Sequence, residues 1–174
     1  MAEPEEQLEI VNEKGEVIGL APRSVIHGNP SLSHRVVHVL VFDSENRLLL
    51  QKRSLNKDVA PGKWDTSVGG HVGPGETLSL SARREMEEEL GINGCDIEYL
   101  YTYTHTNPYE TELVTTYRCA YSGEIAFNRA EIDEVRYWSL EEIKEVMGKG
   151  ILSDNFEHEF ATCLSFHALR TSGP

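Results

Sequence analysis

Short apolar runs bounded by polar turns recur along the chain and predict a series of β-strands. The run from Val36 to Phe42 is nearly continuous, which is typical of a strand buried on both faces of a sheet. Further strands are predicted over Arg47 to Arg53, Ile97 to Thr104, Leu113 to Tyr121 and Val135 to Trp138. The polar stretch from His105 to Glu112 is expected to be a loop that joins two paired strands.

Capping residues and apolar spacing predict three helices. They are expected over Thr77 to Leu90, after Ser139, and over Asp154 to Leu169. The first begins at Glu76 or Thr77 and ends at Gly91. The second has Glu142 at the position that completes a capping box with Ser139. Strands and helices are mixed, so we expect an α/β protein with mainly antiparallel strand pairs.

The first thirty residues predict a smaller unit of their own. Leu8 to Val11 and Val17 to Gly19 flank a polar turn, which indicates a β-hairpin. Pro22 to His27 is expected to be a short helix. We therefore expect residues 1–30 to be an N-terminal hairpin extension and residues 31–174 to be the main domain.

Length and charge narrow the classes of function. The chain of 174 residues fits one compact domain, and its formal net charge of −13 disfavours nucleic acid and anionic lipid as partners. No apolar run approaches the roughly 20 residues that span a bilayer, and the acidic N-terminus does not resemble a signal peptide, so a cytoplasmic protein is expected. Cys95, Cys119 and Cys163 are expected to be free thiols.

Three carboxylates gather on one side of the first predicted helix. At about 100° per residue, Glu85, Glu88 and Glu89 fall within roughly a 100° arc. An apolar stripe that should pack against a sheet flanks this arc: Ala82, Met86 and Leu90. A cation would offset the repulsion among the three acids, and Mg²⁺, with Mn²⁺ as a substitute, suits oxygen ligands and substrate phosphates. The alternative is an acidic helix face exposed to solvent.

The residues around these glutamates follow a fixed spacing. In chain order, its positions are filled by Gly70, Glu76, Arg84, Glu85, Met86, Glu88, Glu89, Gly91 and Ile92. This pattern resembles the signature of the Nudix hydrolase family, and the resemblance covers roughly residues 34 to 169. It implies an α/β/α sandwich with a mixed, mainly antiparallel sheet. It also implies a metal-dependent hydrolase that cleaves a pyrophosphate bond in a nucleoside-diphosphate-linked or related small molecule.

The resemblance further implies the roles of individual residues. Glu85, Glu88 and Glu89 would hold the metal together with the carbonyl oxygen of Gly70, beside which Gly69 permits a close backbone approach.

Three further residues of the pattern would support this metal site. Glu76 and Arg84 would hold the preceding loop against the helix and orient the first of the three carboxylates, and Gly91 would end the helix.

The base that activates water is not fixed by the pattern. Glu85 or Glu88 could serve, and the other candidates are Glu110, Glu112, Glu131 and Glu134. Glu131 and Glu134 are favoured somewhat as candidates for the base, because the segment from Glu131 to Trp138 resembles the segment that usually leads into the last strand in Nudix proteins. Each of the four later glutamates could instead be an ordinary surface acid.

Lys52 and Arg53 are the predicted contacts to substrate phosphates, because they belong to the main basic cluster before the glycine pair. The alternative is ordinary charge at the end of a strand. Glu112 is a further candidate for contact with the substrate.

Other segments resemble the isopentenyl-diphosphate isomerases and their hydrolase-like relatives within the superfamily. These segments are His34 and Arg35, Leu49 to Arg53, Pro61 and Gly62, and Glu110 to Glu112. True isomerases use a histidine-rich metal site and a catalytic cysteine, but we place Ser67 at the cysteine position, and a hydroxyl is a poorer acid than a thiol.

The sequence therefore leaves two alternatives to hydrolysis: an isomerase-like activity, or a diphosphate-binding module without turnover. The roles of four histidines also stay open: His34, His38, His71 and His105. The identity of the diphosphate and the presence of a homodimer are not determined by the sequence.

Overall fold

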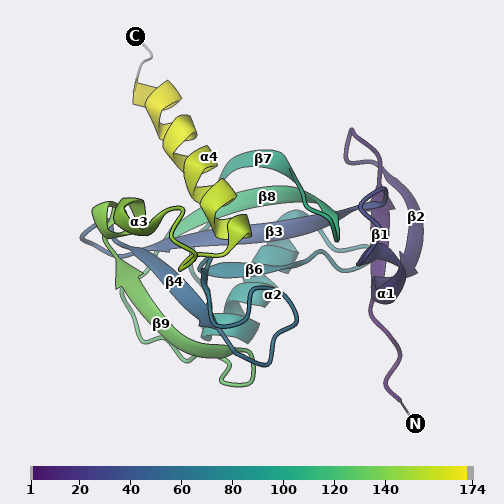
Figure 1. Cartoon of the computed structure of the whole chain (residues 1–174), viewed down its shortest axis with the longest axis horizontal. Coiled ribbons are helices and arrows are strands. Elements are labelled where there is room, and N and C mark those ends of the chain that lie inside the picture. Colours follow the sequence, from purple (N-terminus) through teal and green to yellow (C-terminus); the bar gives the residue numbers. More distant parts are fainter. Residues whose placement is uncertain (1, 172–174) are drawn as a thin grey trace.

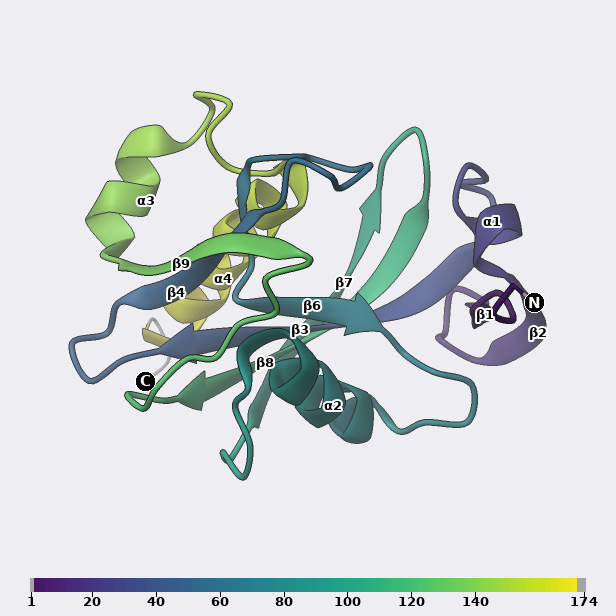
Figure 2. The ribbon, with the colours of Figure 1, turned by 90° about the horizontal axis from the view of Figure 1, so that it is seen from below.

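A computed structural model describes the backbone of residues 2–171 and the side chains of residues 2–167. The strands are β1 (Gln7–Val11), β2 (Val17–Pro22), β3 (Ser33–Phe42), β4 (Leu48–Arg53), β5 (Trp64–Asp65), β6 (Val68–His71), β7 (Glu98–Thr106), β8 (Thr111–Ala120) and β9 (Ile132–Trp138). The helices are α1 (Arg23–Ile26), α2 (Leu78–Leu90), α3 (Leu140–Val146) and α4 (Asp154–Thr171). Helix α2 lies on one side of the sheet, and α3 and α4 lie on the other (Figures 1 and 2).

Strand β3 is the centre of the sheet. It pairs in parallel with β8 over its whole length, from Ser33 opposite Thr111 to Phe42 opposite Ala120. The seven other pairings between described strands are antiparallel, so the predicted mixed, mainly antiparallel sheet is confirmed. Strand β4 meets β3 only at Leu48 and then diverges from it, carrying β5 and β9. This divergence opens the sheet between β4 and β6.

Alternating side chains of β3 enter two cores, one on each face of the sheet. The core under α2 contains Val37, Val39 and Val41 of β3 with Ala82, Met86 and Leu90. The core under α3 and α4 contains Leu40, Phe42, Ile143, Phe156 and Phe160. The apolar run predicted to be buried on both faces is therefore confirmed, as are the apolar stripe on α2 and the α/β/α sandwich.

The predicted helix ends are also confirmed. The Thr77 hydroxyl accepts a hydrogen bond from the Leu80 amide at the start of α2. Gly91 ends α2 with φ of 66°, a left-handed conformation that glycine adopts at no steric cost. Ser139 and Glu142 form the expected capping box at the start of α3.

The loop predicted between the paired strands is shorter than expected. β7 continues to Thr106 and β8 begins at Thr111, so the expectation that 105–112 is a loop was wrong except at 107–110. Asn107 closes this turn, because its side chain accepts hydrogen bonds from the amides of Tyr109 and Glu110 at 2.8 and 3.0 Å. With the turn closed within four residues, the flanking polar residues can pair across the hairpin, and His105 lies opposite Glu112.

The N-terminal hairpin joins the main sheet. β1 and β2 pair as predicted, and β1 also pairs with β3, where Ile10 lies opposite His34. Helix α1 follows, and its Ile26 is fully buried. The three cysteines are free. Within residues 2–171, no helix is both long and apolar enough to cross a membrane.

Candidate active site

A cavity of about 1030 Å³ opens where β3 and β4 diverge. Its lining comes from β3 to β6, α2, the β7–β8 hairpin and the start of α4. Of the described residues, ten with acidic side chains and five lysines or arginines line it. A polyanionic ligand could therefore bind here only with additional positive charge.

The side chain of Glu85 packs closely against Gly70 at the edge of this cavity. A Cβ atom on residue 70 would lie 2.1 Å from Cδ and 2.5 Å from Oε1 of Glu85. Only glycine leaves room for this carboxylate against the backbone of β6. Burial raises the pKa of Glu85, while the neighbouring Arg84 guanidinium opposes the rise.

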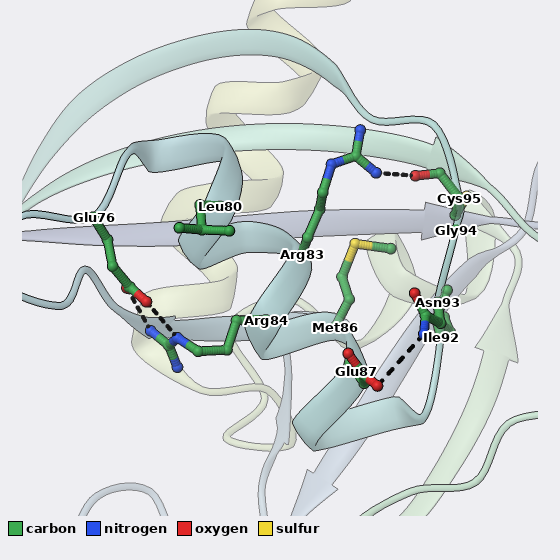
Figure 3. A pocket seen from close by; sticks show the side chains of 10 residues that line it. All are labelled: Glu76, Leu80, Arg83, Arg84, Met86, Glu87, Ile92, Asn93, Gly94 and Cys95. Carbon is green, nitrogen blue, oxygen red and sulfur yellow. Dashed lines mark hydrogen bonds and ion pairs between the residues drawn. The ribbon is translucent and has the colours of Figure 1, made fainter.

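Arg84 and Glu76 form a two-pronged ion pair that ties the glycine-rich loop to α2. Nε and Nη2 of Arg84 donate to the two carboxylate oxygens of Glu76 at 2.9 and 3.0 Å (Figure 3). Glu76 also accepts hydrogen bonds from the Gly73 amide and the Ser81 hydroxyl. These bonds, led by those from Arg84, lower the pKa of Glu76 to about 2. The supporting role predicted for this pair is consistent with this geometry.

The remaining donors of Arg84 reach the candidate metal ligands. Nη1 donates to Glu85 at 2.6 Å and to Glu88 at 3.3 Å, and Nη2 donates to the carbonyl oxygen of His71 at 3.1 Å. One guanidinium thus fixes the loop and two of the three predicted carboxylates. Arg83, its neighbour in sequence, turns to the Cys95 carbonyl and borders a separate hollow of about 480 Å³ (Figure 3).

The third carboxylate, Glu89, is nearly buried. Its Oε2 accepts a hydrogen bond from the Gly69 amide at 3.0 Å, and its Oε1 accepts one from Gln51 Nε2 at 3.2 Å. Burial raises the pKa of Glu89 to about 8, and these two hydrogen bonds oppose the rise. A cation beside it would favour the ionised form.

The three glutamates line one cavity but hold separate partners. Arg84 binds Glu85 and Glu88, whereas Glu89 turns to Gly69. Among the described side chains, their donor atoms do not form a group within 4.8 Å of one another. An all-oxygen donor set, with two carboxylates whose pKa is raised by burial, suits a hard divalent cation such as Mg²⁺.

A second cluster of potential metal ligands lies beside the first. In the described part of the chain, donor atoms lie within 4.8 Å of one another in two groups, one of His27, His34 and His71 and one of His34, Glu110 and Glu112. The three imidazole rings have centroids 5.2 to 5.5 Å apart. The sequence alone does not assign roles to His34 and His71, and nothing in it points to His27, which lies in the N-terminal extension. A 2.6 Å hydrogen bond from the Gly28 amide to the Tyr109 carbonyl brings this extension to the β7–β8 turn.

In this second cluster, Nδ1 of His71 lies 3.2 Å from Oε1 of Glu6, and Oε2 of Glu112 accepts a hydrogen bond from Asn155 Nδ2 at 3.4 Å. Four other atoms of the cluster have no hydrogen-bond partner among the described residues. Nε2 of His27, both ring nitrogens of His34 and Oε2 of Glu110 are buried without one. Burial lowers the pKa of His27 to about 4 and of His34 to about 3, so both rings are neutral near pH 7. Burial also raises the pKa of Glu112 to about 7. Neutral imidazoles with unpartnered nitrogens next to carboxylates are the ligand set that transition-metal cations prefer.

Ser67, placed in the sequence analysis at the position of the isomerase cysteine, does not face the cavity. It is fully buried, donates to the Leu49 carbonyl oxygen and accepts a hydrogen bond from the Val41 amide at 3.0 Å. Its hydroxyl therefore bridges strands. Of the described residues that line the cavity, none is a cysteine.

The other predicted site residues divide between the cavity and its surroundings. Arg53, Glu112 and Glu131 line it, while Lys52 and Glu134 do not. Side chains alternate along a strand, so Lys52 points away from the face that carries Arg53, and it lies opposite Glu134 in the pairing of β4 with β9. Nη1 of Arg53 donates a hydrogen bond to Oδ2 of Asp65 at 3.3 Å, and Nε donates one to the Val59 carbonyl oxygen at 2.8 Å.

The sandwich, the loop tied to α2 by an ion pair and the glutamates beside a glycine pair together define a Nudix domain. A family model described as the NUDIX domain matches residues 32–156. The chain belongs to the Nudix family.

Curated relatives agree with this assignment. The chain is 36% identical over 138 residues to the uncharacterized Nudix hydrolase YfcD of Escherichia coli, covering 79% of this chain and 76% of YfcD. It is 46% identical over 90 residues to Nudix hydrolase 3 of Arabidopsis thaliana, covering 51% of this chain and 12% of the relative. It is 40% identical over 103 residues to an isopentenyl-diphosphate Delta-isomerase of Streptomyces griseus, covering 58% of this chain and 52% of the relative. The chain thus spans about half or less of the latter two relatives.

Solved structures share the fold. DR0079 from Deinococcus radiodurans has a TM-score of 0.79 at 24% identity, covering 91% of this chain and 99% of that structure. The NUDIX domain of NrtR from Shewanella oneidensis, solved in complex with ADP ribose, has a TM-score of 0.60 at 16% identity, covering 87% of this chain and 94% of that domain.

Proposed function

We propose that the protein is a divalent-metal-dependent hydrolase that cleaves the pyrophosphate bond of a nucleoside-diphosphate-linked or related diphosphate compound. The observation that carries the proposal is the packing of Glu85 against Gly70, with Arg84 holding Glu85 to the cavity wall. Glu85, Glu88, Glu89 and the Gly70 carbonyl would hold Mg²⁺, with Mn²⁺ as a substitute. The bound cation would neutralise phosphate oxygens and lower the pKa of a bound water.

The residues of the chain prepare the cavity for this reaction. The Glu76–Arg84 ion pair fixes α2 relative to the glycine-rich loop, so the carboxylates keep one geometry. Arg53 lies in the cavity lining, where its guanidinium suits phosphate oxygens, and Lys52 adds positive charge to the same strand. Of the late glutamates, Glu110 and Glu112 would be ligands of the second cluster and Glu134 does not line the cavity, so Glu131, which does line it, is the favoured base.

We propose that the second cluster holds a further divalent cation of the transition-metal type. His27, His34, His71, Glu110 and Glu112 would be its ligands. The proposal is supported by the buried, unpartnered nitrogens and oxygen of this cluster, which are costly unless a cation or another partner satisfies them.

The substrate class is supported by the volume of the cavity and by a protein of the same fold that was solved with a bound ligand. A cavity of about 1030 Å³ is large enough for a nucleotide-sized molecule. The Shewanella NUDIX domain of the same fold was solved with ADP ribose, a compound in which a diphosphate links a nucleoside to another group.

The test is a substrate panel with purified, chelator-treated protein and added Mg²⁺ or Mn²⁺. The panel contains nucleotide sugars, dinucleotides, nucleoside di- and triphosphates and isoprenoid diphosphates, with products identified by ³¹P NMR. We expect cleavage of at least one compound, with the rate reduced about 100-fold or more in Glu88→Gln and unchanged in Glu145→Gln, an exposed glutamate of α3. No cleavage with either metal, or full activity of Glu88→Gln, contradicts the proposal.

A second candidate function is an isomerase-like activity, favoured by the histidine-rich cluster and by the Streptomyces isomerase relative. No cysteine is found among the described residues that line the cavity, so the thiol that this chemistry would require is not supplied by them. Incubation with isopentenyl diphosphate, followed by ¹H NMR, separates the two candidates. Formation of dimethylallyl diphosphate without phosphate release would support the isomerase.

A further inference from the structure

His38 of β3 and Glu159 of α4 form a buried pair next to the candidate active site. His38 is 5% exposed and Glu159 is fully buried. Nδ1 of His38 lies 2.8 Å from Oε2 of Glu159, although 121 positions separate the two residues in the chain. The pair lies on the face of the sheet opposite to α2 and does not belong to either candidate metal-binding cluster.

In the described part of the chain, the other hydrogen-bond partners of the Glu159 carboxylate are all hydroxyl donors. The Tyr101 hydroxyl donates to Oε1 at 2.6 Å, and the hydroxyls of Tyr103 and Thr116 donate to Oε2. Burial acts to raise the pKa of Glu159, but the bonds from His38, Tyr101 and Tyr103 hold it below its ordinary value. The carboxylate is therefore ionised, and Nδ1 of His38 must be the donor in their hydrogen bond.

An ionised, buried carboxylate needs a counter-charge, and the His38 ring is the cationic group in contact with it. Burial acts to lower the pKa of His38, but Glu159 raises it by hydrogen bond and charge, with smaller contributions from Glu112 and Asp65. Other titratable groups also act on this pair. Burial raises the pKa of Cys163 and of the two tyrosines of β7, whereas burial and the charges of His158 and His38 lower the pKa of His105. This contact with a buried carboxylate favours the imidazolium form of His38, in which Nε2 also carries a proton.

Nε2 of His38 faces the cavity. His38 lies opposite Gly69 in the pairing of β3 with β6, and both residues line the cavity. A Cβ on residue 69 would lie 3.1 Å from Cδ2 and 3.4 Å from Nε2 of His38, so the absence of a side chain at Gly69 leaves the imidazole edge open. Among the described residues, none forms a hydrogen bond with Nε2.

Two arginines that line the cavity, Arg84 and Arg53, already have partners, whereas Nε2 of His38 has none in the described part of the chain. Arg84 is bound to three carboxylates, and Arg53 is bound to Asp65 and a carbonyl. We propose that His38 is a further substrate-contacting residue, which donates from Nε2 to an oxygen of the diphosphate, and that Glu159 is its positioning residue. This inference rests on the proposed function, because it names the chain's own contact to the same substrate.

Two amide substitutions separate this role from a merely structural one. The amide nitrogen of asparagine can replace Nδ1, so His38→Asn keeps the bond to Glu159 but loses the donor in the cavity. The amide nitrogen of glutamine can replace Nε2, so His38→Gln keeps the cavity donor but loses the bond to Glu159. His158→Gln is the matched control, because His158 borders Tyr103 but does not line the cavity.

The first measurement is kcat/KM for the substrate identified in the panel, with thermal unfolding as a check of folding. We expect His38→Asn to lose about 100-fold, as for removal of a preorganised donor to a developing phosphate charge, and His38→Gln to retain clearly more activity. A purely structural role predicts the opposite order. Equal activity of His38→Asn and wild type, or lower activity of His38→Gln than of His38→Asn, overturns the inference and leaves the hydrolase standing.

The second measurement does not require turnover. Methylenediphosphonate, a diphosphate analogue that cannot be hydrolysed, is titrated with Mg²⁺ into protein labelled with ¹⁵N-histidine. We expect the Nε2 resonance of His38 to shift on binding and the affinity to fall about tenfold in His38→Asn. If the analogue binds without a change in the chemical shift of Nε2, the role proposed for His38 is wrong. If this chemical shift changes but no compound of the panel is cleaved, only the proposed hydrolysis is wrong.

Discussion

Gly70 and Glu85 cannot both keep their places if residue 70 carries a side chain. A Cβ at position 70 would lie 2.1 Å from Cδ of Glu85, well inside van der Waals contact. The neighbouring Arg84 holds Glu85 from the other side at 2.6 Å, so the carboxylate has little freedom to withdraw. The position of this carboxylate is thus determined jointly by a missing side chain and a guanidinium.

We therefore expect Gly70→Ala to reduce kcat/KM by about 100-fold, because misplacement of a metal ligand by about 1 Å has an effect of this size. Steady-state kinetics with saturating Mg²⁺ measure the loss. Gly19→Ala is the matched control, since a Cβ there would meet Ile10 at 3.6 Å, an ordinary contact, and should leave activity unchanged. Wild-type activity in Gly70→Ala would show that Glu85 is not needed in this position.

Glu76→Gln should destabilise the protein at neutral pH by about 2 kcal/mol, because it removes the charged partner of Arg84 and the carboxylate that accepts hydrogen bonds from the Gly73 amide and the Ser81 hydroxyl. The pKa of Glu76 falls from 4.5 to about 2 on folding, so the unfolded chain binds more protons between these values. This contribution to stability is complete above about pH 4.5 and is lost as the pH falls toward about 2.

Urea unfolding at a series of pH values tests this prediction. The difference in unfolding free energy between wild type and Glu76→Gln should shrink as the pH falls below 4.5. The exposed Glu145→Gln should follow the wild type throughout. A difference that stays constant down to pH 2 would mean that the ion pair does not depend on this carboxylate's charge.

His34→Gln should abolish binding of a transition-metal cation at the second cluster, because His34 belongs to both ligand groups. In the wild type, Zn²⁺ or Mn²⁺ at about 100 times its Kd should stabilise the fold by about 2.7 kcal/mol, and a chelator should reverse this effect. Elemental analysis after dialysis and the shift in Tm report binding. His158→Gln should keep the metal, and retention of one equivalent at the same affinity by His34→Gln would rule out this site.

The same histidine makes the metal-free protein sensitive to acid. Burial lowers the pKa of His34 from 6.5 to about 3 in the folded state, so the unfolded chain binds more protons in this interval. Stability should therefore decrease as the pH falls through it, and His34→Gln should show a shallower decrease. Thermal unfolding in chelator between pH 7 and pH 4 measures both slopes, and parallel slopes would contradict the prediction.

Glu131→Gln should lower kcat by about 100-fold if this residue is the base, whereas Glu134→Gln should leave kcat within about twofold of the wild type. The pair is well matched, because both are glutamates at or next to the start of β9 and, of the two, only Glu131 lines the cavity. The pH dependence of kcat provides a second readout, since loss of a base removes the acidic limb of the profile. If both substitutions have equally small effects on kcat, Glu131 is not the general base, and Glu85 or Glu88 would be assigned this role instead.

The sequence by itself determined what local spacing can encode. The apolar run of β3, the stripe on α2, the caps at Thr77 and Gly91 and the Nudix pattern could all be read from it, because they depend on residues a few positions apart. The same spacing placed Glu85, Glu88 and Glu89 on one side of α2. It could not show that Arg84 would bind two of them while Glu89 turned to Gly69.

Tertiary structure alone decided which distant residues share a site. His27 comes from the N-terminal extension, and Glu159 comes from the last helix, so neither has a local signal that points to the cavity. Parallel pairing of β3 with β8 places His34 opposite Glu112. The divergence of β3 from β4 opens the cavity that separates these two residues from the glutamates of α2. The sequence predicted the same phosphate-binding role for Lys52 and Arg53. Because side chains alternate along β4, Arg53 lines the cavity and Lys52 does not. Short-range sequence patterns determine where helices and strands form. The register and connectivity of the strands determine which distant residues become adjacent, and this site is built from such residues.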